Sequence, residues 1–154
     1  GSGLRGAPAN SQCAAPRKPL PLLLMAGTGD TSVPYQGGTV LSYAPGGGGV
    51  VLGAEATVAQ WRQLARLPDT PQRSQFPHRD SNDATRASRQ LWGADPKGLQ
   101  VELLTVADGG HAEPSQRYRF GPMARVILGA QNADVEAAVE AWTFFRDKRA
   151  AAAP

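Results

Sequence analysis

Residues 20–34 read LPLLLMAGTGDTSVP, and this stretch decides how the rest of the sequence is interpreted. Six apolar residues and one proline fill positions 20–26, a composition typical of a strand buried on both faces in the centre of a parallel sheet. The run ends in a Gly-Thr-Gly turn at 27–29, where glycine permits a sharp change of direction, and Asp30 follows directly. Because open α/β sheets hold ligands and catalytic groups beyond the carboxyl ends of their strands, Asp30 is a candidate functional residue.

A second apolar stretch, 99–106, leads into Asp-Gly-Gly and then His111. If the two stretches are neighbouring strands of a parallel sheet, Asp30 and His111 emerge at the same edge. Such a pair can serve as the acid and base of a hydrolase, because the carboxylate orients the histidine that takes the proton of the nucleophile. The order Asp before His is also the order of α/β-hydrolases. Taken singly, Asp30 fits a structural turn residue and His111 a loop residue, so the prediction depends on both strands.

The composition is that of one globular domain spanning residues 1–154. Apolar residues make up 41% of the chain, charged residues make up 19%, and the net charge is +3. The arginines are scattered rather than clustered with aromatic residues, so we expect no nucleic-acid partner. No apolar run of about 18 residues occurs, so we expect no membrane partner either.

Apolar residues at helical spacing predict two helices. The first spans residues 54–67 and ends at Pro68, and the second has Asn132 as its N-cap. Their apolar side chains are expected to pack in the core: Trp61, Val135, Val139, Trp142, Phe144 and Phe145. The other expected segments are an irregular loop at 68–84, a strand at 85–92, a turn at 95–98 and a long loop at 112–131.

Three segments carry a family resemblance: MAGTGDTSVPYQGG at 25–38, VELLTVADGGHAEP at 101–114 and LGAQNADVEAAVEAWTFF at 128–145. Together with the helix that contains Trp61, they resemble the carboxyl half of the polyhydroxybutyrate depolymerase and feruloyl esterase group, which are secreted bacterial α/β-hydrolases. In that group the first segment reads like HGTxDxxVPYxGG, and a later GGH is usually followed by Trp-Pro. The resemblance covers the chain from about Cys13 to Phe145.

The resemblance implies a serine esterase that uses a Ser-Asp-His mechanism, with Asp30 as the triad acid and His111 as the triad histidine. It also implies a partial α/β-hydrolase fold, composed of the last parallel strands and helices of a doubly wound sheet. The substrate would be a carboxylic ester: a polyester, an acylated polysaccharide or a small aryl ester. No cofactor is implied. The location implied is secreted or periplasmic, although the first residues of the chain do not have the pattern of a signal peptide.

The sequence departs from the family pattern at several positions. Ala26 stands where the family often has His, and Glu113 replaces the Trp that usually follows the histidine. None of the eight serines has glycine at both −2 and +2, so the nucleophile elbow of α/β-hydrolases is missing. We therefore expect the nucleophile on a missing N-terminal half and expect the chain to be inactive alone. A non-catalytic binding module on a hydrolase scaffold is the alternative, and nothing favours a peptidase of the same fold.

The remaining candidate sites are weaker. His78 is expected to be a loop residue rather than a ligand, and Cys13 has no cysteine partner in this chain. With two histidines and one cysteine, a zinc site is not expected. The acidic cluster at 80–83 lacks the spacing of an EF-hand, so a solvated turn is favoured over a calcium site. The four glycines at 46–49 are interpreted as a flexible loop tip rather than a phosphate cradle.

Overall fold

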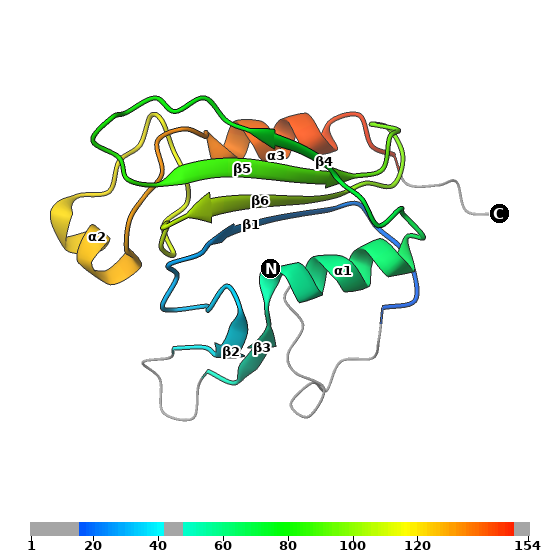
Figure 1. Cartoon of the computed structure of the whole chain (residues 1–154), viewed down its shortest axis with the longest axis horizontal. Helices are drawn as coiled ribbons and strands as arrows, with labels where there is room; N and C mark the ends of the chain where they lie inside the picture. The colour runs from blue at the N-terminus through cyan, green and yellow to red at the C-terminus, as the bar shows by residue number, and fades with distance from the viewer. Residues whose placement is uncertain (1–15, 42–47, 150–154) are drawn as a thin grey trace.

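The computed structural model describes residues 16–41 and 48–149, and Figure 1 shows their arrangement. Four strands form one sheet in the order β1-β6-β5-β4. Their bounds are Leu22–Gly27 for β1, Gln72–Gln75 for β4, Arg86–Trp92 for β5 and Val101–Ala107 for β6. A separate two-stranded ribbon pairs β2 (Gly37–Thr39) with β3 (Val50–Leu52). The helices are α1 (Ala54–Leu64), α2 (Pro122–Leu128) and α3 (Ala137–Phe145). None of them is long and apolar enough to cross a membrane.

The sheet is mixed, which confirms an α/β fold but corrects the expected doubly wound parallel sheet. β1 and β6 are parallel, in a register from Leu22 opposite Val101 to Gly27 opposite Val106. β5 runs antiparallel to both of its neighbours, β6 and β4. The turn at 95–98 links β5 to β6, with the Gly98 amide donating to the Asp95 carbonyl at 3.1 Å. A connection this short joins antiparallel strands, whereas parallel strands need a long crossover.

The central strand is β6 rather than β1. β6 pairs on both sides and is buried over most of its length, whereas β1 lies at the edge of the sheet and is only partly buried. The apolar run at 20–26 is therefore correctly interpreted as a strand, but its position in the sheet was wrong. An apolar strand at an edge leaves backbone groups and side chains without a neighbour among the described residues.

Alternate residues of β6 serve two separate cores. Leu103 packs with Val58 of α1 and Leu24 of β1, while Leu104 packs with Val135 and Ala87 on the opposite face. Accordingly, α1 and α3 lie on opposite sides of the sheet (Figure 1). Side chains of a strand alternate between faces, so β6 is the element that holds both layers together.

An ion-pair network fastens α3 to the sheet. Arg89 of β5 donates from Nε to Glu102 of β6 at 2.7 Å. Its Nη2 donates to Glu140 of α3. Burial raises the pKa of Glu102, and the bond from Arg89 offsets only part of that rise. A buried Glu102 carboxylate without a partner would destabilise the protein, so its ion pair with Arg89 is needed to keep it charged.

The two predicted helices have different bounds in the structure, and the second also buries different residues from those predicted. α1 ends at Leu64 rather than 67, because Arg66 adopts a left-handed conformation (φ 54°) ahead of Pro68. α3 begins at Ala137 with Glu136, not Asn132, in the N-cap position. The expected packing of α3 is also wrong, since Val139, Trp142 and Phe145 are exposed; Trp142 is 68% exposed. Ala137 and Phe144 are the buried residues of this helix.

Two segments expected to be loops contain regular structure. The loop at 68–84 includes β4, and the loop at 112–131 includes α2. β4 reads QRSQ and is exposed throughout, so it has no apolar alternation to reveal it. α2 has no buried residue, so its sequence lacks the helical spacing of core residues by which a helix is predicted. Part of the glycine loop at 46–49, and all of Cys13, lie outside the described residues.

We expect Leu104→Ala to lower the free energy of unfolding by about 2–5 kcal/mol, because it empties the fully buried centre of β6. Leu20→Ala is the matched control, since Leu20 is 55% exposed and should change stability by less than about 0.5 kcal/mol. Urea titration followed by circular dichroism measures both. Equal losses for the two variants would contradict the central role of β6.

Candidate functional site

Asp30 and His111 lie together where β1 and β6 end. Oδ2 of Asp30 and Nδ1 of His111 are 2.8 Å apart, although the residues are separated by 81 positions. The parallel register of β1 and β6 brings both carboxyl ends to one edge of the sheet. The predicted juxtaposition is therefore confirmed, while the catalytic role of the pair stays a prediction.

The loop after β1 fixes the orientation of the Asp30 carboxylate. Its Oδ1 accepts the backbone amides of Ser32 at 2.8 Å and Val33 at 2.9 Å. This bonding leaves Oδ2 to face His111. The Asp30 side chain is 10% exposed and that of His111 is 46% exposed. The histidine thus has one ring nitrogen held by a shielded carboxylate, and its ring is open to solvent.

Glycines allow the two turns to approach each other. The Gly29 amide donates to the Gly109 carbonyl at 2.8 Å, and the Asp108 amide donates to Thr28 Oγ1, also at 2.8 Å. A Cβ at Gly27 would lie 2.3 Å from the carbonyl oxygen of Gly109, far inside van der Waals contact. Any side chain at position 27 would therefore push the Asp30 turn away from the histidine turn.

The far side of the histidine turn rests on the end of α2. The His111 amide donates to the Leu128 carbonyl at 2.6 Å, and the Gly110 amide donates to the Ala130 carbonyl at 2.8 Å. A Cβ at Gly110 would lie 2.2 Å from the Leu128 carbonyl oxygen. The position of His111 is thus set by α2 as well as by β6.

We expect Gly110→Ala to destabilise the protein by about 2–4 kcal/mol, because the new methyl group forces the histidine turn off α2. Gly121→Ala is the matched control, because nothing lies within 4 Å of a Cβ there and its φ of −65° suits alanine. Thermal unfolding measures stability, and NMR chemical shifts of the His111 ring report its displacement. An unchanged His111 environment in the first variant would contradict this account.

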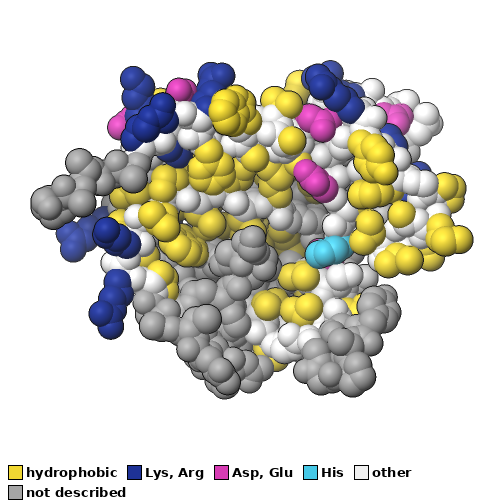
Figure 2. Space-filling model, turned by 180° about the vertical axis from the view of Figure 1, so that it is seen from behind, with side chains coloured by type: hydrophobic (Ala, Val, Ile, Leu, Met, Phe, Trp, Pro, Cys, Tyr) yellow, Lys and Arg dark blue, Asp and Glu magenta, His cyan; other side chains and the backbone are white. Residues whose placement is uncertain are grey.

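A groove runs along the open edge of β1 to the Asp30–His111 pair. Its volume is about 660 Å³. The walls come from Ala54 of α1 on one side and from Phe145 of α3 on the other. Figure 2 shows hydrophobic side chains gathered over this hollowed face. An apolar groove that ends at a few converging polar groups has the general form of a small-molecule site.

Tyr35 braces the floor of this groove, a role that our sequence analysis missed. Its hydroxyl lies 3.1 Å from Thr105 Oγ1 on β6 and 3.4 Å from Glu55 of α1. Burial raises the pKa of Tyr35, the bond with Thr105 lowers it in part, and the nearby Glu55 raises it further. The neutral phenol therefore ties the Asp30 loop to the sheet. The signal that could have found it is the VPY triplet at 33–35.

Glu113 lies on the rim of the groove, and no nucleophile lies beside it. The described residues that line the groove include no serine, threonine or cysteine. Ser115, nearest in sequence to His111, is buried and donates its hydroxyl to Glu136. The described lining residues therefore place no hydroxyl or thiol beside the Asp30–His111 pair.

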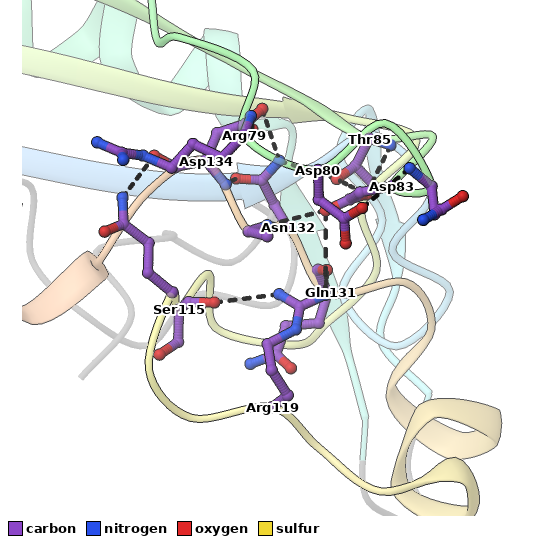
Figure 3. A network of polar contacts seen from close by, with 12 residues as sticks. Arg79, Asp80, Asp83, Thr85, Ser115, Arg119, Gln131, Asn132 and Asp134 are labelled. Atoms are coloured by element: carbon purple, nitrogen blue, oxygen red, sulfur yellow. Dashed lines mark hydrogen bonds and ion pairs between the residues drawn. The ribbon is translucent and has the colours of Figure 1, made fainter.

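A second histidine–aspartate pair lies outside the groove. Nδ1 of His78 is 3.0 Å from Oδ1 of Asp134, whose side chain is fully buried. The Arg79 amide and the Asn132 side chain also donate to this carboxylate, within the network of Figure 3. His78 is a loop residue as expected, but its pairing was not predicted. The pair ties the loop before β5 to the segment before α3.

The acidic cluster at 80–83 belongs to the same network, and its carboxylates accept backbone amides. Asp83 accepts the Thr85 amide and the Ala133 amide, each at 2.9 Å, and Asp80 accepts the Asn82 amide. Across the part of the chain that the structure describes, no three His, Cys, Asp or Glu side chains are grouped to hold a metal ion.

We expect stability to fall at acid pH through Asp134. Burial alone would raise the pKa of Asp134, but the bonds from Arg79, Asn132 and His78 outweigh it and hold the pKa below the usual 3.8. A lowered pKa contributes stability above the unfolded value that is lost as pH falls through the folded value. Asp134→Asn should cost about 2–4 kcal/mol at pH 7 and remove this dependence as the pH falls below the usual carboxyl pKa. Urea titrations at a series of pH values measure it, with exposed Asp80→Asn as the control.

Compared with protein-family models, with curated proteins and with solved structures, the chain matches none. The class that the geometry defines is an α/β protein with an oriented histidine–carboxylate pair at the carboxyl edge of a parallel strand pair. Its family is not shown, so any function must be argued from the site itself.

Proposed function

We propose that this chain supplies the acid and base of a serine-type carboxylic-ester hydrolase of the α/β-hydrolase class. The single observation that carries the proposal is the 2.8 Å contact between Asp30 Oδ2 and His111 Nδ1 at the carboxyl ends of two parallel strands. The resemblance of the flanking segments to polyhydroxybutyrate depolymerases and feruloyl esterases gives the same assignment. The secreted or periplasmic location belongs to the same proposal.

The two side chains have distinct roles in this mechanism. Asp30 holds Nδ1 of His111 and stabilises the imidazolium that forms during the reaction. Nε2 of His111 takes the proton from a hydroxyl as that hydroxyl attacks the ester carbonyl, and then returns it to the leaving alcohol. Because Oδ1 of Asp30 is already bonded to two backbone amides, the carboxylate keeps its orientation while the charge on the histidine changes.

The nucleophile would arrive on a segment that docks along the open edge of β1. A strand parallel to β1 on this edge would end near the Asp30–His111 pair, at the same edge of the sheet where β1 and β6 end. The groove along this edge is apolar, and α3 presents the exposed side chains of Val139, Trp142 and Phe145 next to it. Large exposed apolar faces of this kind mark sites of association. The proposed partner is therefore a polypeptide half that carries the nucleophilic serine.

The experiment is to co-express the chain with the polypeptide encoded directly before it and to measure hydrolysis of p-nitrophenyl esters. We expect Asp30→Asn to lower kcat by about 10⁴-fold and His111→Ala to lower it by on the order of a million-fold. His78→Gln is the matched control, since the other histidine lies outside the groove, and it should retain activity. Hydrolysis that survives His111→Ala would overturn the mechanism.

The 154-residue chain by itself should not hydrolyse these esters above background, because loss of the nucleophile alone costs on the order of a million-fold. The measurement is the same assay on the purified chain. Appreciable hydrolysis that disappears in His111→Ala would show that a nucleophile within the chain had been overlooked.

A non-catalytic binding module is the second candidate, favoured by one observation. Glu113 lines the groove where related enzymes usually have Trp, and the described lining residues include no hydroxyl or thiol nucleophile. The co-expression experiment separates the two functions. A stable complex that binds an ester without hydrolysing it, with no serine elbow in the upstream sequence, would favour the module.

A further inference from the structure

A protruding surface on α2 is not used by the proposed reaction. It consists of Tyr118, Met123, Val126 and Ile127, and we call these four residues the α2 apolar patch. Their exposed fractions are 69%, 82%, 86% and 58%. Met123, Val126 and Ile127 are spaced so that they share one face of the helix. α2 lies beyond the carboxyl ends of β1 and β6 (Figure 1), and hydrophobic side chains project there at the edge of the face in Figure 2.

The α2 helix is held to the histidine turn at its carboxyl end rather than by its apolar face. None of its residues is buried. The Leu128 carbonyl accepts the His111 amide, and the Gly129 amide donates to the Arg125 carbonyl at 2.9 Å. Met123 and Val126 therefore contribute nothing to the core and project from the molecule. Projecting apolar side chains of this kind can insert into a deformable surface such as a lipid bilayer. A protein partner would need a pocket of matching shape to bind them.

The charge within residues 117–128 is entirely positive, although Glu113 and Glu136 line a small pocket with Tyr118, to which no residue of α2 contributes. Residues 117–128 contain three arginines and no acidic residue. Arg117 and Arg125 are exposed, and within the described residues their side chains form no ion pair. Arg119 is partly occupied, because it donates to the Ser115 and Gln131 carbonyls. A patch with this composition is complementary to a surface that is both apolar and anionic.

We propose that the α2 apolar patch, with Arg117 and Arg125, docks the protein onto an anionic lipid bilayer. Apolar side chains enter the boundary between headgroups and acyl chains, and arginines bind the anionic headgroups. This proposal does not depend on the ester hydrolase. It amends the expectation from composition that no membrane is a partner, because peripheral docking needs no membrane-spanning helix. Since α2 also holds the His111 backbone, docking would bring the Asp30–His111 pair to the lipid surface.

The test is flotation of the purified 154-residue chain with vesicles of phosphatidylcholine containing 30% phosphatidylglycerol, compared with pure phosphatidylcholine. We expect binding to the anionic vesicles that weakens as salt is raised. Met123→Ser combined with Val126→Ser should lower the partition coefficient at least tenfold, and so should Arg117→Gln combined with Arg125→Gln.

Matched controls replace equivalent residues elsewhere. Leu20→Ser with Leu41→Ser removes two exposed apolar side chains, and Arg73→Gln with Lys97→Gln removes two exposed charges. Both controls should bind as the unaltered chain does. Absence of binding to anionic vesicles, equal binding to neutral vesicles, or equal losses in the controls would overturn the proposal. Quenching of Trp142 by brominated lipid would assign insertion to α3 and would overturn it too.

Discussion

The close approach of two glycine turns is the constraint on which the rest of the structure depends. The turn after β1 and the turn after β6 approach closely enough for a direct backbone bond, with the Gly29 amide donating to the Gly109 carbonyl at 2.8 Å. A carbonyl oxygen lies 2.3 Å from where a Cβ at Gly27 would be, so no other residue fits without displacement. This packing converts the parallel pairing of β1 and β6 into a fixed contact between Asp30 and His111. It also places the histidine turn against the end of α2, so β1, β6 and α2 together position His111.

The open edge of β1 gives this site an apolar groove. β6 is surrounded, with Leu103 and Leu104 filling cores on opposite faces, whereas β1 pairs on one side only among the strands that the structure describes. The groove of about 660 Å³ along that edge is apolar and ends at the Asp30–His111 pair. Unpaired strand edges are normally shielded because they associate readily. An edge that is left apolar beside an oriented histidine is therefore consistent with a site completed by another polypeptide segment.

The sequence predicted the structure best where one motif indicates both the type of a side chain and its place at the end of a strand. The strands at 20–26 and 99–106, and the meeting of Asp30 with His111, were predicted because apolar runs ending in glycine turns specify both. The place of β1 at the edge could not be predicted, since an apolar run does not reveal how many neighbours it has. Trp142 was misplaced because helical spacing identifies an apolar face but not what covers it. The pairing of His78 with Asp134 joins two irregular loops, and loops carry no period from which proximity can be inferred.

The separation of the parallel strands along the chain has a consequence for the order of folding. β5 and β6 are joined by a short turn and can pair while the rest of the chain is still forming, but Asp30 and His111 are 81 residues apart. Contacts so distant in sequence carry a larger loop-closure entropy and form late. The antiparallel strands thus offer a template onto which β1 is added afterwards. We therefore expect the contact between Asp30 and His111 to form only at that late step, so that a partly folded chain lacks it.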